Sequence, residues 1–139
     1  MFDLIENLID EYECKGDFTY ASVSEELLSG AEKDLNIQIP EQYRWFLKKY
    51  GHGGISGIET LGIGLNGKAV FVDATIKYRS YGMPNNLIVI ENCDEWLYCL
   101  DAEDESIVMW SQGQEECDYA YATFLEYLKD RMDDAIENL

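Results

Sequence analysis

The pattern of hydrophobic positions predicts three helices in the first third of the chain. In each of them, hydrophobic residues recur three and four positions apart, the spacing that places side chains on one face of a helix. The first set is Phe2, Ile5, Leu8, Ile9 and Tyr12; the second is Leu27, Leu28, Ala31 and Leu35; the third is Tyr43, Phe46, Leu47 and Tyr50.

Local signals predict where these helices begin and end. Ser22 and Glu25 have the spacing of a capping box, which would start the second helix. Pro40 fits the first position of the third helix. Gly51 fits the left-handed residue that ends it, since glycine adopts that conformation at little cost.

The middle of the chain has the composition of strands. Gly53 and Gly54 allow a sharp turn into ISGIETL (55–61), which we expect to be the first strand. Residues with β-branched and aromatic side chains predict three further strands, at 87–90, 96–100 and 106–110. Because the connections between these three are short, an antiparallel meander is expected.

Two hydrophobic segments remain. Residues 69–80, AVFVDATIKYRS, predict a short helix, or a strand that runs into one. From Tyr119 on, helical spacing predicts a closing helix, with one face formed by Tyr121, Phe124, Leu125, Leu128, Met132, Ala135 and Leu139. The predicted fold class is therefore α+β: N-terminal helices, a central, mainly antiparallel β-sheet, and a C-terminal helix packed on it, in a single domain of residues 1–139.

The distribution of charge adds a functional expectation. A net charge of −18 repels nucleic acid and anionic membranes and attracts basic proteins, so we expect neither nucleic acid nor a membrane as partner. From Ser80 to Leu128 the chain has eleven acids and no Lys or Arg, whereas Gln42 to Arg79 has six basic residues and two acids. Solubility alone is one explanation, but soluble surfaces usually mix both signs. We therefore predict an acidic face with a function.

The four cysteines do not have the spacing of a zinc site. They lie at 14, 93, 99 and 117, and the chain has one histidine. We expect free, buried thiols in a reducing cytoplasm, and no metal. The acidic N-terminus differs from signal and transit peptides, and no hydrophobic run approaches the length of a membrane span.

One glycine-rich segment invites an enzymatic interpretation. GIGLNGKA (62–69) matches both the dinucleotide-binding pattern and the spacing of a phosphate-binding loop. However, the predicted strands lack the crossover helices of a parallel sheet, and Ala69 stands where a Ser or Thr hydroxyl would bind magnesium. We expect a turn at Asn66–Gly67, no nucleotide cofactor and no enzyme.

The remaining candidate residues are His52 and the tryptophans. His52 has no recognisable nucleophile context, so a solvated loop residue is expected. Trp45, Trp96 and Trp110 belong to the core by default. Trp110, however, ends a predicted edge strand beside acidic turns, and aromatic residues with acids around them are typical of protein interfaces.

Five segments, in order, carry a resemblance to a known family: IPEQYRWFLKKYGHGGISG (39–57), YRSYGMPNNLIVIE (78–91), EWLYCLD (95–101), IVMW (107–110) and ATFLEYL (122–128). Together they resemble the SUKH superfamily of small bacterial toxin-immunity proteins, which also includes relatives of the yeast cell-wall synthesis regulators. The helix, its YG-x-GG turn and the following I-x-G are the most specific part. His52 departs from the family, which commonly has a small residue there.

The resemblance implies an α+β fold and a protein that, without catalytic residues, binds and neutralises a cognate toxin, often a nuclease, inside the cell. Nuclease toxins must be basic to hold phosphate, so an acidic face suits such a partner. We predict that the meander and its turns bind the toxin, through Glu91, Asp94, Glu95, Trp96, Asp101, Glu103, Asp104, Glu105 and Trp110.

Successive turns of a meander emerge at opposite ends of the sheet, so one acidic turn should matter more than the other. We favour the turn that includes Asp101, Glu103, Asp104 and Glu105, because it is the denser group and precedes the strand that ends at Trp110. The alternative function is an intracellular scaffold or regulatory module with a non-toxin client. A nucleotide-dependent enzyme is supported only by the glycine pattern.

Overall fold

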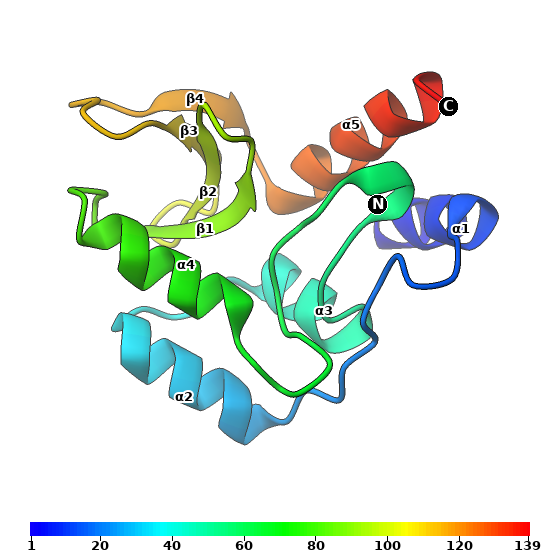
Figure 1. Ribbon diagram of the computed structural model, residues 1–139, viewed down its shortest axis with the longest axis horizontal. Coiled ribbons are helices and arrows are strands. Elements are labelled where there is room, and N and C mark those ends of the chain that lie inside the picture. The colour runs from blue at the N-terminus through cyan, green and yellow to red at the C-terminus, as the bar shows by residue number, and fades with distance from the viewer.

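The computed structural model describes residues 1–139. Its elements, in chain order, are α1 (Phe2–Tyr12), α2 (Glu25–Leu35), α3 (Glu41–Lys49), a 3-10 turn η1 (Ile55–Gly57), α4 (Val70–Arg79), β1 (Leu87–Asn92), β2 (Leu97–Asp101), β3 (Ile107–Trp110), β4 (Asp118–Tyr121) and α5 (Phe124–Glu137). In Figure 1 the curved sheet lies at the upper left, α4 and α2 lie below it, and α5 and α1 lie at the right. No helix has both the length and the hydrophobicity that a membrane crossing requires.

The sheet confirms the predicted antiparallel meander and the α+β class. Its strand order is β1-β2-β3-β4, and every neighbouring pair is antiparallel. One face packs on α4, where the Val89 amide donates to the Thr75 hydroxyl at 3.0 Å. The other face meets α5, where the rings of Tyr98 and Tyr127 lie 5.5 Å apart. Because β1 and β2 are covered on both faces, nearly all of their side chains are buried.

The helices bury the faces that their periodicity predicted. Ile5 and Ile9 of α1, Leu28, Ala31 and Leu35 of α2, and Tyr43, Phe46 and Leu47 of α3 all belong to one hydrophobic cluster of 33 buried residues. In the middle of that cluster the Tyr43 and Phe46 rings lie 5.3 and 5.7 Å from the ring of Phe124 in α5. The C-terminal helix therefore closes the same core that the N-terminal helices build.

The helix ends differ in part from the predicted ones. Ser24, not Ser22, caps α2, and its hydroxyl accepts a hydrogen bond from the Leu27 amide. Pro40 is the N-cap of α3 rather than its first helical residue. The prediction for Gly51 is confirmed, since this residue follows the end of α3 with a φ of +79°.

Two segments have a different secondary structure from the expected one. Residues 55–61 are not a strand: they form η1 and an irregular loop, because Ser56 (φ +53°) and Gly57 (φ +88°) turn the backbone away from an extended path. Residues 118–121, expected in part as the start of the last helix, form β4 instead. The helix begins only after Thr123, whose hydroxyl accepts from the Glu126 amide. β4 pairs with β3, so Trp110 ends an inner strand and not an edge strand.

Candidate functional site

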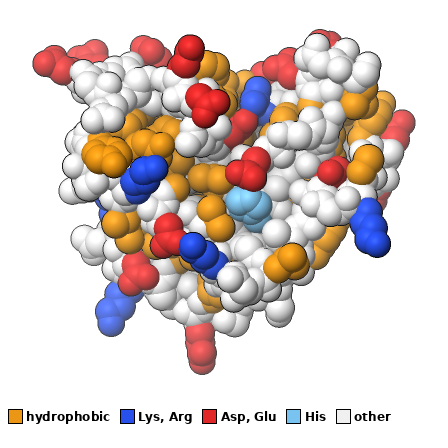
Figure 2. Space-filling view, viewed as in Figure 1, with side chains coloured by type: hydrophobic (Ala, Val, Ile, Leu, Met, Phe, Trp, Pro, Cys, Tyr) orange, Lys and Arg blue, Asp and Glu red, His pale blue; other side chains and the backbone are white.

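The acids of the sheet region lack cationic partners within the chain. Of the eleven acids between Ser80 and Leu128, only Glu91 forms an ion pair. The other ten are Asp94, Glu95, Asp101, Glu103, Asp104, Glu105, Glu115, Glu116, Asp118 and Glu126. Of the seventeen acids elsewhere in the chain, six lie in ion pairs, as where Arg44 lies within 3.1 Å of both Glu25 and Glu32. Figure 2 shows acidic side chains along the upper edge of one face, over the β3–β4 loop and α5. The sheet therefore carries negative charge that the protein itself does not compensate.

The two acidic turns of the meander lie at opposite ends of β2. One turn joins β1 to β2 and holds Asp94 and Glu95; the other joins β2 to β3 and includes Glu103 to Glu105. Trp110 is the register partner of Leu97, at the start of β2. Trp110 therefore lies with the first turn and not with the second, although it belongs to the strand that the second turn precedes. The predicted order of turn and strand is confirmed, but it does not bring the second turn close to Trp110.

The first turn borders a cleft of about 310 Å³. The lining residues are Tyr78, Asp94, Glu95, Trp96, Leu97, Trp110, Ser111 and Gln112. The Tyr78 ring stands edge-on to that of Trp110, with 6.3 Å between the centroids. Four of the predicted site residues thus come together here. Tyr78, one of the aromatic residues that lie near Trp110 in the sequence, comes to the cleft from α4. Ser111 and Gln112 were not predicted, because they become neighbours of the first turn only through the register of β2 and β3.

The mouth of this cleft is held by backbone hydrogen bonds that leave its carboxylates free. Asp94 has a φ of +66°, and its amide donates to the side-chain oxygen of Asn92 at 2.8 Å. The Ser111 hydroxyl donates to the backbone carbonyl of Glu95 at 3.1 Å, which ties the β3–β4 loop to the first turn. Neither the Asp94 nor the Glu95 side chain forms a hydrogen bond or ion pair. Both carboxylates are therefore available to a partner.

Two indole groups beside these acids lack hydrogen-bond partners. The Nε1 atoms of Trp96 and Trp110 are buried, and neither donates to any group of the protein. Trp110 is only 2% exposed. Buried indole N–H groups usually find an acceptor, and one left without it costs about 1–3 kcal/mol. The two rings therefore line the cleft beside the free carboxylates, while their N–H groups are closed to solvent.

The acids of the second turn are used differently. The Asp101 side chain accepts from the Glu103 amide at 2.9 Å, and Asp104 accepts from both the hydroxyl and the amide of Ser106. These hydrogen bonds, the Ser106 hydroxyl first, lower the pKa of Asp104 from its ordinary value. The concavity at this end has no aromatic residue; its lining residues are Asn36, Ile37, Gln38, Asn85, Asn86, Ala102 and Glu103. At least two of these carboxylates therefore shape their own turn.

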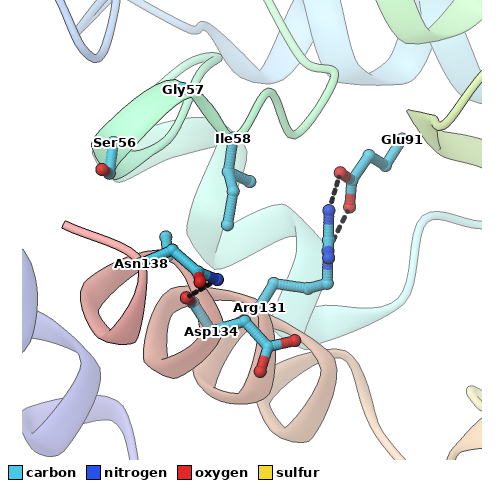
Figure 3. Close-up of a pocket in the computed structure, with 8 residues that line it drawn as sticks. Ser56, Gly57, Ile58, Glu91, Arg131, Asp134 and Asn138 are labelled. Atoms are coloured by element: carbon cyan, nitrogen blue, oxygen red, sulfur yellow. Dashed lines mark hydrogen bonds and ion pairs between the residues drawn. The ribbon is translucent and has the colours of Figure 1, made fainter.

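Glu91 does not belong to the exposed acidic surface. It is 5% exposed, and Figure 3 shows its carboxylate pointing at the guanidinium of Arg131. Arg131 donates to it through Nε at 2.9 Å and Nη2 at 2.6 Å, and the Tyr127 hydroxyl donates at 2.8 Å. Burial, and then the negative charge of Glu91, hold the pKa of Tyr127 far above its usual value. Because this carboxylate is saturated inside the protein, we leave Glu91 out of the partner-binding surface, and Trp110 contributes only to the wall of the cleft.

Hydrogen bonds join the two glycine-rich loops, residues 51–54 and 62–67. The Gly62 amide donates to Nδ1 of His52 at 2.9 Å, the Ile63 amide to the Gly51 carbonyl at 2.7 Å, and the Gly64 amide to the Lys68 carbonyl at 2.8 Å. Three of the amides that a phosphate-binding loop would offer to a ligand are therefore already paired. His52 is largely buried, with 15% of its side chain exposed, and is not the solvated loop residue expected from the sequence.

Comparison with known proteins agrees with the fold and with the resemblance. The family model described as SUKH_5, SMI1-KNR4 cell-wall, matches residues 4–133. The chain belongs to this family. A similar solved structure is described as a crystal structure of a protein from Pseudomonas syringae pv. tomato. It has 22% sequence identity and a TM-score of 0.73, and the match covers 94% of this chain and 96% of that one, so the likeness supports the fold.

Proposed function

We propose that this member of the SUKH family is an immunity protein that binds a basic toxin domain inside the cell and neutralises it without catalysis. The observation that carries the proposal is the set of ten acids on and around the sheet that have no cation within the chain. The family includes immunity proteins, so a basic toxin is a partner that would match this negative charge. A nuclease is the toxin class that fits best, because its active cleft must be basic to hold phosphate.

The chemistry of neutralisation would be electrostatic. An acidic surface raises the rate of encounter with a basic protein, and once bound it occupies the cleft that the nucleic acid needs. Affinity then depends on the few residues that are fully enclosed in the interface, while the surrounding acids set the rate and the salt dependence. The same surface repels nucleic acid, so the immunity protein binds the toxin and not the toxin's substrate.

Within this surface we place the centre of the interface at the first turn, with Asp94, Glu95 and Trp96. Aromatic residues and free carboxylates occur together there, whereas the acids of the second turn partly serve the backbone. Asp101, Glu103, Asp104 and Glu105 become part of the charged surroundings, where reversal of charge mainly slows association.

The test is the association rate with the toxin domain encoded beside this chain, measured at about 50 and about 300 mM salt. We expect the wild-type rate to fall as salt rises, and the variant with Glu103 and Glu105 changed to Lys to associate more slowly at low salt while its melting temperature stays unchanged, since neither side chain forms a hydrogen bond or ion pair. A rate that ignores both salt and charge reversal would exclude electrostatic steering by this face.

The alternative function is a scaffold or regulatory module of the same fold with a non-toxin client. A protection assay separates the two: cells that produce the toxin should survive only when this chain is present. Binding to a basic client without any protection would favour the scaffold.

A further inference from the structure

The cleft at the first turn has features that general electrostatic attraction does not require. It is a concavity of about 310 Å³ rather than a flat acidic patch, and its lining includes Tyr78, Trp96 and Trp110 as well as two carboxylates. A surface that only steered a partner would need the charges but not the aromatic walls.

We propose that this cleft receives one arginine of a partner loop, with Asp94 and Glu95 as its acceptors and Trp96 as its stacking surface. The proposal rests on the proposed function for the identity of the partner, which would be the toxin. The occupant must be cationic because both carboxylates are free of hydrogen bonds and of ion pairs within the chain. The sheet has no cation of its own, since residues 80–128 contain no Lys or Arg, and Lys77 of α4, which lies over the Tyr78 ring, forms no ion pair with either carboxylate.

Arginine fits the cleft better than lysine. Its planar guanidinium has five donors, binds carboxylates through two parallel hydrogen bonds and stacks on aromatic rings. The aromatic surface for this stacking comes mainly from Trp96, because Trp110 is buried and Lys77 already lies over the Tyr78 ring, 5.3 Å from its centroid.

The indole N–H groups do not contact the occupant. The Nε1 atoms of Trp96 and Trp110 are buried, so a group in the cleft meets the ring of Trp96 and the two carboxylates instead. Two carboxylates beside an aromatic ring suit a planar cation that both hydrogen-bonds and stacks. That the arginine belongs to a polypeptide loop follows from the proposed function.

A peptide titration tests the cleft without any toxin. The probe is an acetylated and amidated Gly-Arg-Gly peptide, added up to about 10 mM to the full chain, with the indole N–H resonances of its three tryptophans followed by NMR. We expect those of Trp96 and Trp110 to shift saturably while that of Trp45 stays in place. A peptide with citrulline, which keeps the shape and the carbonyl but loses the charge, should produce no saturable shift.

Matched variants locate the binding. The pair Asp94→Asn and Glu95→Gln should abolish the response, and the pair Glu103→Gln and Glu105→Gln, which removes the same charge at the other end of the sheet, should leave it intact. Trp96→Phe leaves a smaller ring for stacking, and it should weaken peptide binding about threefold. No saturation with the arginine peptide, or an equal response to citrulline, would overturn the proposal.

The toxin then shows whether the cleft is used. With the toxin domain, the Asp94→Asn and Glu95→Gln pair should raise the Kd at least about tenfold more than the control pair. A cleft that binds the peptide in a protein that binds no toxin would uphold this inference and refute the proposed function. Toxin binding that responds equally to both pairs would uphold the function and overturn the role of the cleft.

Discussion

The carboxylate of Glu91 and the guanidinium of Arg131 join β1 to α5 across 40 positions of sequence. The pair lies on the face of the sheet opposite to α4, where Arg131 also covers the ring of Tyr98, 5.4 Å from its centroid. Residues 80–128 contain no Lys or Arg, so the cation that pairs with Glu91 comes from α5, three residues after this range. The pair is the one place where the last helix supplies charge compensation to the sheet.

Removal of Arg131 should destabilise the fold and leave partner binding unchanged in the folded fraction. Arg131→Met leaves the buried Glu91 without its cation, and we expect the free energy of unfolding to fall by about 2–3 kcal/mol. This is less than for a fully enclosed pair, because 22% of the Arg131 side chain is exposed. Urea denaturation measures the loss. Asp133→Asn, which breaks the more exposed ion pair with Lys129, is the control and should cost below about 0.5 kcal/mol.

The hydrogen bond from Gly62 to His52 predicts a structural role for the histidine. His52→Ala leaves the Gly62 amide without an acceptor, so we expect a loss of about 1–3 kcal/mol in unfolding free energy. His52→Asn offers a side-chain oxygen at a similar distance from the backbone and should restore part of that loss. Equal stability of the wild type and the alanine variant in thermal and urea unfolding would show that the hydrogen bond contributes nothing.

Gly62 and Gly64, two glycines of the same pattern, should differ in how well they tolerate alanine. A Cβ at Gly62 would lie 1.8 Å from the Gly51 carbonyl oxygen, whereas the nearest atom to a Cβ at Gly64 is 3.6 Å away. Gly62→Ala should therefore cost about 3 kcal/mol or more, or prevent folding, since backbone must move. Gly64→Ala should stay within about 1 kcal/mol of the wild type. Comparable losses in the two variants would contradict close backbone packing as the reason for the first glycine.

The cysteines should react with an alkylating agent in an order set by burial. Burial, and then the charge of Glu91, raise the pKa of Cys93 to about 11, and burial also raises the pKa of Cys117 and Cys99. Only the thiolate reacts, so at pH 8 the exposed Cys14 should be modified first and Cys99, which is fully buried, last. The rate of alkylation at Cys93 should keep rising as the pH approaches 11, because the fraction of thiolate grows up to the raised pKa of this residue. Peptide mass spectrometry of the native protein gives the order.

Helices α1, α2 and α3 followed from hydrophobic spacing, and β1, β2 and β3 from their β-branched and aromatic residues, whereas the segment of α4 fitted a helix or a strand. β4 was not predicted: Tyr121 continues the helical spacing of Phe124 and Leu125, and only the hydroxyl of Thr123 separates strand from helix. Residues 55–61 contain β-favouring isoleucines, yet the loop that they form is fixed by tertiary hydrogen bonds, such as that between Thr60 and Gly53.

The candidate site could be predicted only in part for a similar reason. The acids of the first turn and Trp96 are adjacent in sequence, so composition was enough to mark them. The position of Trp110 depends on strand register, and the burial of Glu91 depends on Arg131, which is distant in the chain. Sequence alone does not distinguish an acid that faces solvent from one that a remote base has already neutralised.

The absence of lysine and arginine from residues 80–128 also decides which chemical reagents reach this surface. Trypsin has no cleavage site between Arg79 and Lys129, so the whole sheet leaves a digest as one peptide, and the cysteine experiment needs a protease that cuts at aromatic or acidic residues. Amine-directed cross-linkers and lysine acylation have no target on the sheet. A carbodiimide, which activates carboxylates, would instead couple these acids directly to the lysines of a bound basic protein, and each cross-link would identify one contact.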